Sequence, residues 1–279
     1  MFLKIKNLNQ NPIVKILVFA NLLIAFCALA QVLLTYLIFS IPLNSANIAY
    51  LLFIFLSTYL QYNMQRGYMI NNENIHSERS LWLLKHKKLL MYSIGASLIA
   101  VMFLCNNLSW TSIGIMIGAE IVSTLYYLKP FNLRQHGYIK PFLISTVWVI
   151  SSSLVPLIEN KLVTEQNVWF VLSQFFFISV LCLLFDIKDG ECDYLAGVNT
   201  YANKFGVKIA KLICFALVAF SVMCFFQFTD DIYFRVFVVI FNLLVIATII
   251  LTNENRDSFY FYLWIDGLLV LQPLFYWCL

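Results

Sequence analysis

Near its start the chain contains a run of fifty residues, from Ile16 to Gln65, without a single charged side chain. A helix needs about 20 apolar residues to cross the hydrocarbon core of a membrane, so this run is long enough for two crossings. The segment from Pro42 to Asn47 interrupts it and predicts a turn between them. Only 11% of the whole chain is charged and 62% is hydrophobic, which excludes an ordinary soluble domain. The sequence therefore predicts a polytopic membrane protein.

The apolar segments of the rest of the chain are continuous and do not alternate with period two, so helices are favoured over a β-barrel. We expect an all-α membrane protein, a single domain over residues 1–279 with about nine transmembrane helices. The expected spans are 14–40, 47–65, 89–106, 110–128, 141–158, 167–185, 207–227, 232–251 and 258–277.

The basic residues predict the orientation of these spans. With nine crossings and a cytoplasmic N-terminus, sixteen of the eighteen Lys and Arg residues fall on the inner side, and only Lys161 and Arg235 fall outside. Cytoplasmic loops of membrane proteins carry this excess. We therefore expect a multi-pass protein of the plasma (inner) membrane with its C-terminus outside. The net charge of +4 is then a topology signal, and no nucleic-acid partner is expected.

Two long polar connections, 66–88 and 186–206, lie on the predicted inner face and would cap any active cavity. In the second, the stretch DIKDGECD (186–193) places Asp186, Asp189 and Asp193 within about 60° of one another on a helix, whereas Lys188 and Glu191 point away. Carboxylates on one stripe repel each other unless a cation lies among them, and hard oxygen ligands suit Mg²⁺. The spacing alone is equally compatible with a solvated acidic helix end.

The longer stretch DIKDGECDYLAGVNTYANKFGVKIAK (186–211) resembles the second aspartate-rich motif of the UbiA superfamily of intramembrane prenyltransferases. That motif is D-x-x-D-x-x-x-D, followed by Gly-x-x-Thr and a further Gly. The matching residues here are Asp186, Asp189, Asp193, Gly197, Thr200 and Gly206. The segment YYLKPFNLR (126–134) also resembles the Tyr-rich end of the family's fourth span and the basic loop behind it.

The resemblance implies a helical bundle around a central, lipid-open cavity. In this family Mg²⁺ holds a prenyl diphosphate, which is ionised and coupled to an aromatic or lipid acceptor. Diphosphate is a good leaving group only when its charge is neutralised, and the allylic cation survives only where water is excluded. The implied cofactor is therefore Mg²⁺, and the implied partners are a prenyl diphosphate, its acceptor and membrane lipids.

The first aspartate-rich motif of the family is missing. It would follow the second span, yet the first 185 residues contain no aspartate. Asn63 and Arg66 share a helix face at this place, and Arg66 and Arg79 are candidates to contact a phosphate with guanidinium donors in place of a second Mg²⁺. Glu73 or Glu78 would be alternative carboxylate donors. The other interpretation is that this basic segment only follows the positive-inside rule.

Glu120 lies in the middle of the fourth span, where an exposed carboxylate costs several kcal/mol, so it should face protein or a wet cavity. Three further polar residues are predicted on its face: Ser123, Thr124 and Tyr127. Gly114 and Gly118 lie largely on the opposite face and predict a contact with a neighbouring helix. Glu120 would orient an acceptor or take its proton, or would serve only as a structural hydrogen-bonding group.

By resemblance, the leading hypothesis is a Mg²⁺-dependent prenyltransferase in which Asp186 and Asp189 hold the metal and Asp193 supports them. The candidate substrate-binding residues are Asn63, Arg66, Arg79, Tyr127 and Lys140. Because the first motif is missing, a non-catalytic relative that binds or moves an isoprenoid lipid, or scaffolds a membrane complex, stays open. A membrane terpene cyclase that closes the cation on itself is a third hypothesis.

Overall fold

The computed structural model describes residues 11–73 and 78–278, and no strand occurs within these ranges. The main helices are α2 (Pro12–Phe19), α3 (Leu22–Ile38), α4 (Ser45–Glu73), α5 (Glu78–Lys85), α6 (Lys87–Leu104), α7 (Trp110–Tyr127), α8 (Lys140–Val149), α9 (Val155–Glu159), α10 (Glu165–Leu195), α11 (Tyr201–Phe205), α12 (Val207–Phe228), α13 (Ile232–Leu251) and α14 (Gly267–Trp277). Two π-helical segments, η4 (Ile150–Leu154) and η5 (Tyr260–Ile265), adjoin α8 and α14.

Each predicted span overlaps one of these helical segments, which confirms the all-α membrane bundle. Among the described residues, five helices are long and apolar enough to cross a membrane: Lys87–Asn107, Lys140–Glu159, Glu165–Leu195, Val207–Phe228 and Ile232–Leu251. The pair α2 and α3 makes a sixth if it is counted as one bent span. The count of nine crossings stays a prediction. The helices α4 and α10 continue past their predicted ends, so both polar connections begin as helix.

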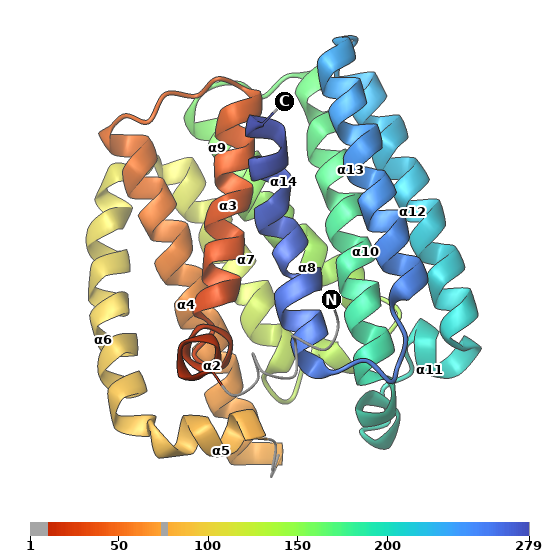
Figure 1. Cartoon of the computed structure of the whole chain (residues 1–279). Coiled ribbons are helices and arrows are strands. Elements are labelled where there is room, and N and C mark those ends of the chain that lie inside the picture. The colour runs from red at the N-terminus through yellow and green to blue at the C-terminus, as the bar shows by residue number, and fades with distance from the viewer. Residues whose placement is uncertain (1–10, 74–77, 279) are drawn as a thin grey trace.

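The bundle has two halves (Figure 1). In one half α10 packs along α12 and α8, with α13 beside α12. In the other half α4 packs against α3 and α6, and α14 packs against α3. Fully buried phenylalanines, which include Phe170, Phe225, Phe237 and Phe241, fill the space between α10, α12 and α13. This aromatic core makes α10 a rigid support for the polar residues at its C-terminal end.

The first span is bent by 66° between α2 and α3. Asn21, at the bend, has a φ of 62°, a left-handed conformation that asparagine tolerates better than most residues. The Ala20 carbonyl accepts a hydrogen bond of 3.1 Å from Nδ2 of Asn63 in α4. Asn21 Nδ2 donates in turn to Asn63 Oδ1 at 3.0 Å. A buried hydrogen-bond hub thus ties the bend to α4.

The turn after α10 depends on the residues that the family motif contains beyond its aspartates. Gly197 (φ +74°) and Gly206 (φ +88°) adopt backbone conformations that other residues rarely reach. Between them Thr200 caps α11 in a reciprocal capping box with Asn203. Asn203 Nδ2 also donates to the carbonyls of Val198 and Gly190. The turn is therefore fixed to the last part of α10.

Candidate active site

A cavity of about 330 Å³ lies between the two halves of the bundle, lined by residues of α2, α3, α4, α5, α7, α8, η4, α10, η5 and α14. Most of its charged lining residues gather near the C-terminal ends of α4 and α10 and the N-terminal end of α8, whereas Glu120 and Asp266 lie on α7 and at the start of α14. Further along these helices the lining is largely apolar and includes Ile54, Leu143, Ile144, Val147 and Leu181. The cavity therefore offers a charged end and an apolar end.

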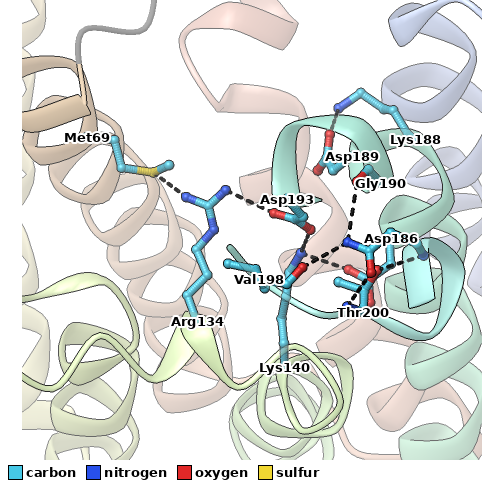
Figure 2. A network of polar contacts seen from close by, with 11 residues as sticks. Met69, Arg134, Lys140, Asp186, Lys188, Asp189, Gly190, Asp193, Val198 and Thr200 are labelled. Carbon is cyan, nitrogen blue, oxygen red and sulfur yellow. Dashed lines mark hydrogen bonds and ion pairs between the residues drawn. The ribbon is translucent and has the colours of Figure 1, made fainter. Parts of the chain in front are cut away.

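The aspartates of α10 lie on one stripe, as predicted, and protein cations lie among them (Figure 2). Lys140 Nζ is 2.7 Å from Asp186 Oδ1 and 2.8 Å from Asp193 Oδ2. Arg134 Nη2 is 3.3 Å from Asp193 Oδ1. Asp186 and Asp193 are almost completely buried. The mutual repulsion of the carboxylates is thus relieved by an ammonium and a guanidinium group from the α7–α8 connection and the start of α8.

Lys188 differs from its prediction. It was expected to point away from the aspartate stripe, but it lines the cavity and its Nζ lies 2.9 Å from Asp189 Oδ1. The same Nζ lies 4.9 Å from the ring centre of Tyr262. The long lysine stem reaches back to its neighbour Asp189, which a helical projection of Cβ directions does not predict.

Lys140 and Arg134 reach the aspartates because the backbone of the α7–α8 connection lies close to the backbone of the turn after α10. A Cβ on Gly137, between these two residues, would collide with the backbone carbonyl of Asn199. Glycine at this position lets the α7–α8 connection lie directly against the turn that follows α10. Arg134 also reaches the sulfur of Met69 in α4, with Nη1 to Sδ at 3.9 Å, so one guanidinium group connects α4 to α10.

The residues present fit a Mg²⁺ ion at the end of α10. Asp186 and Asp189 both line the cavity, and Oδ2 of Asp186 is buried without a hydrogen-bond partner. An unsatisfied carboxylate oxygen of this kind is a ligand for a hard cation. Asp193 does not line the cavity, and both its oxygens have protein donors. Among the described side chains no group of three acidic, His or Cys residues is placed to hold a metal, so oxygen ligands from outside the protein would have to complete the coordination.

Arg66 and Arg79 line the cavity at its charged end. Arg79 donates to the carbonyl of Phe19 at 3.4 Å and to Oδ1 of Asn21, and its guanidinium carbon lies 5.4 Å from the centre of the Tyr262 ring. Burial, and next the positive charge of Arg66, lower the pKa of Arg79 to about 10. Arg79 therefore remains charged at neutral pH, next to a second cation, and both its hydrogen-bond acceptors in the α2–α3 bend are neutral.

Two predicted substrate-binding residues lie elsewhere. Asn63 does not line the cavity, since its side chain is buried in the hub at the α2–α3 bend. Tyr127 does not line it either; its ring packs on Tyr68 at 5.5 Å, and Tyr126 lines the cavity instead. The structure therefore places neither side chain against the cavity, because a helix face read from sequence does not tell which of its neighbours it meets.

Glu120 lines the cavity, as predicted, and it is also exposed on the surface of the chain. The cavity face of α7 contains Met116, Ala119, Ser123 and Tyr126 as well. Asp266, one turn after Tyr262, is a second acid in the lining. Because Glu120 belongs to both surfaces, the cavity reaches the outside of the bundle beside α7.

No family model and no curated protein matches this sequence. Its fold, however, is similar to that of a UbiA homolog from Archaeoglobus fulgidus, with a TM-score of 0.68 and 15% sequence identity over 95% of this chain and 98% of that chain. The structure of a UbiA homolog from the same organism bound to GPP and Mg²⁺ has a TM-score of 0.70 and 16% identity with the same coverage. The family resemblance predicted from residues 186–211 is thus confirmed at the level of the fold.

Proposed function

We propose that this chain, which has the fold of the UbiA homolog, is a Mg²⁺-dependent prenyltransferase that moves a prenyl group from a prenyl diphosphate to an aromatic or lipid acceptor within the membrane. The observation that carries the proposal is the pair Asp186 and Asp189, which faces a cavity with one charged and one apolar end. The unsatisfied Oδ2 of Asp186 supports a cation there. The A. fulgidus structure, which contains GPP and Mg²⁺, supports the choice of ligands.

In this proposal Asp186 and Asp189 hold Mg²⁺, which when bound neutralises the diphosphate and makes it a good leaving group. Lys140 fixes the Asp186 carboxylate, and Asp193 with Arg134 fixes Lys140. Arg66 and Arg79 contact the phosphate oxygens.

The apolar end of the cavity holds the prenyl chain and excludes water from the reacting carbon. Tyr62 and Trp148, joined by a hydrogen bond of 3.3 Å, lie in this lining. Glu120, at the opening beside α7, orients the acceptor or takes its proton. An acceptor that enters from the membrane would meet this carboxylate first.

Prenyl transfer by the purified protein tests the proposal directly. Labelled prenyl diphosphates are incubated with lipid or quinone precursors and Mg²⁺, and products are identified by mass spectrometry. We expect turnover by the wild type, loss of turnover in Asp189→Ala, and normal turnover in the control Asp230→Ala, which removes an exposed acid before α13. Equal turnover by the wild type and Asp189→Ala would show the assignment to be wrong.

A second candidate is a non-catalytic relative that binds an isoprenoid lipid. It is favoured by one observation, that each of the three α10 aspartates already has a protein cation as partner. Tight binding of a prenyl lipid that needs no Mg²⁺, with no product in the same assay, would favour this candidate. An acceptor-free assay that yields a hydrocarbon would instead indicate a membrane terpene cyclase.

A further inference from the structure

The two sides of the cavity differ in net charge: the α10 side is balanced, whereas the α4–α5 side is positive. On the α10 side, the three carboxylates of Asp186, Asp189 and Asp193 are matched by three cations: Lys140, Arg134 and Lys188. This side is therefore neutral before any metal binds. Arg66 and Arg79 on the α4–α5 side take no part in the ion pairs among the described side chains. We call Arg66 and Arg79 the arginine wall.

Arg79 makes no ion pair with a described carboxylate, although the Tyr262 phenol and the Asp266 carboxyl group both favour its charge. It donates to a backbone carbonyl and to the amide oxygen of Asn21, and its plane lies near the ring of Tyr262. Lys188 lies near the same ring, so the phenol separates two cations that line one cavity. The acids of the lining outside α10 are Glu120 on α7 and Asp266, one turn further into the bundle than Tyr262. Keeping two guanidinium groups together without a paired carboxylate is costly unless an anion joins them.

We propose that the arginine wall binds the diphosphate group directly, so that this protein binds a prenyl diphosphate without a metal and needs Mg²⁺ only for the reaction. The inference rests on the proposed function, because it takes the prenyl diphosphate as the ligand of the cavity. Guanidinium groups form paired, charge-assisted hydrogen bonds with phosphate oxygens. The wall lies at the place where the sequence lacks a first aspartate-rich motif, and it supplies fixed positive charge there in place of metal-binding carboxylates.

Binding measured in EDTA tests the inference on the full-length protein in detergent. The probes are geranyl S-thiolodiphosphate, a slowly ionising analogue, and inorganic pyrophosphate, with geraniol as the probe that lacks the anion. We expect the wild type to bind the thiolodiphosphate in EDTA within about 10-fold of its affinity in Mg²⁺, and to bind geraniol much more weakly. Arg66→Gln should weaken binding in EDTA about 10-fold, and the double variant with Arg79→Gln about 100-fold.

Arg235→Gln is the matched control, because Arg235 lies in α13 and pairs with Asp230 away from the cavity, and we expect its binding to be unchanged. Arg66→Lys keeps the charge and should retain part of the affinity, which separates charge loss from misfolding. No binding by the wild type in EDTA, equal binding of geraniol, or unchanged binding by Arg66→Gln would each overturn the inference. Metal-free binding without any transfer product in Mg²⁺ would leave the inference standing and contradict only the proposed function. Transfer activity without metal-free binding would contradict the inference and leave the proposed function standing.

Discussion

Asp186 and Asp193 share the ammonium group of Lys140, but they face different surroundings. Asp186 lines the cavity with one oxygen unsatisfied, whereas Asp193 is fully buried between Lys140 and Arg134. We expect Asp186→Asn to abolish prenyl transfer with a small loss of stability. Asp193→Asn should lower the free energy of unfolding by up to about 3–5 kcal/mol, because the buried Lys140 and the half-buried Arg134 both lose an ion-pair partner. Turnover and thermal unfolding measured on both variants check this difference, and equal stability losses would contradict it.

Lys140 is the cation that the aspartate stripe requires. Lys140→Met leaves the Asp186 and Asp193 carboxylates buried without their ammonium partner, so we expect a loss of about 3–5 kcal/mol in the free energy of unfolding. Mg²⁺ should restore part of that loss, since a hard cation suits the same oxygens. Lys208→Met, at an exposed position of α12, is the control. Unfolding curves with and without Mg²⁺ measure both effects, and a variant as stable as the wild type would refute the role of Lys140.

At the scale of elements, the contact between the α7–α8 connection and the turn after α10 positions the ion pairs of the site. Gly137→Ala would force a Cβ against the Asn199 carbonyl, which cannot move without displacing the turn. We expect lower thermal stability and a clear fall in transfer activity. Gly95→Ala, in the exposed middle of α6 with open space around it, should be neutral or stabilising by up to about 1 kcal/mol. A similar response of the two variants would show that the close approach does not matter.

The helices were predictable because hydrocarbon thickness and the loss of backbone hydrogen bonding to water leave few alternatives. The contacts between the helices were harder to predict from the sequence. Gly114 and Gly118 were expected to pack against a neighbouring helix, but a Cβ at either would meet nothing within 4 Å. A pattern of small residues permits a close contact without specifying a partner. Glu120 and Ser123 line the cavity, whereas Thr124 and Tyr127 of the same predicted polar face do not. An acid in a span has few other stable locations than a cavity or a protein contact.

The part of the site that lies on one helix could be predicted from the spacing of its charged residues. The contacts between segments distant in the sequence could not. The stripe of Asp186, Asp189 and Asp193 follows from helical spacing alone. Its partner Lys140 was identified as a phosphate contact, yet the structure places its ammonium group between two aspartates. The structural role of Asn63 could not be predicted, because its hydrogen-bond partners, Ala20 and Asn21, lie at a bend that the hydrophobic pattern does not reveal. Tyr262 carried one usable signal in the sequence, its position one turn before Asp266, an acid within a predicted span.

At the scale of the whole molecule, the two exposed cysteines provide a test of topology. Cys192 lies near the end of α10 at the charged end of the cavity, and Cys278 follows α14, which ends at the opposite end of the bundle (Figure 1). With nine crossings and a cytoplasmic N-terminus, Cys192 should face the cytoplasm and Cys278 the outside. We therefore expect a membrane-impermeant maleimide to label Cys278 in right-side-out vesicles and Cys192 in inside-out vesicles.

The variants Cys192→Ser and Cys278→Ser assign each signal, because each should lose labelling in one vesicle orientation only. The other described cysteines are buried or partly buried in the bundle, so they should react slowly until the protein is unfolded. That labelling pattern would place the charged end of the cavity in the cytoplasm, where the proposed function requires a water-soluble diphosphate head group to reach it. Labelling of both cysteines from the same side would imply an even number of crossings between them in place of the predicted three, and it would remove the argument for a cytoplasmic site.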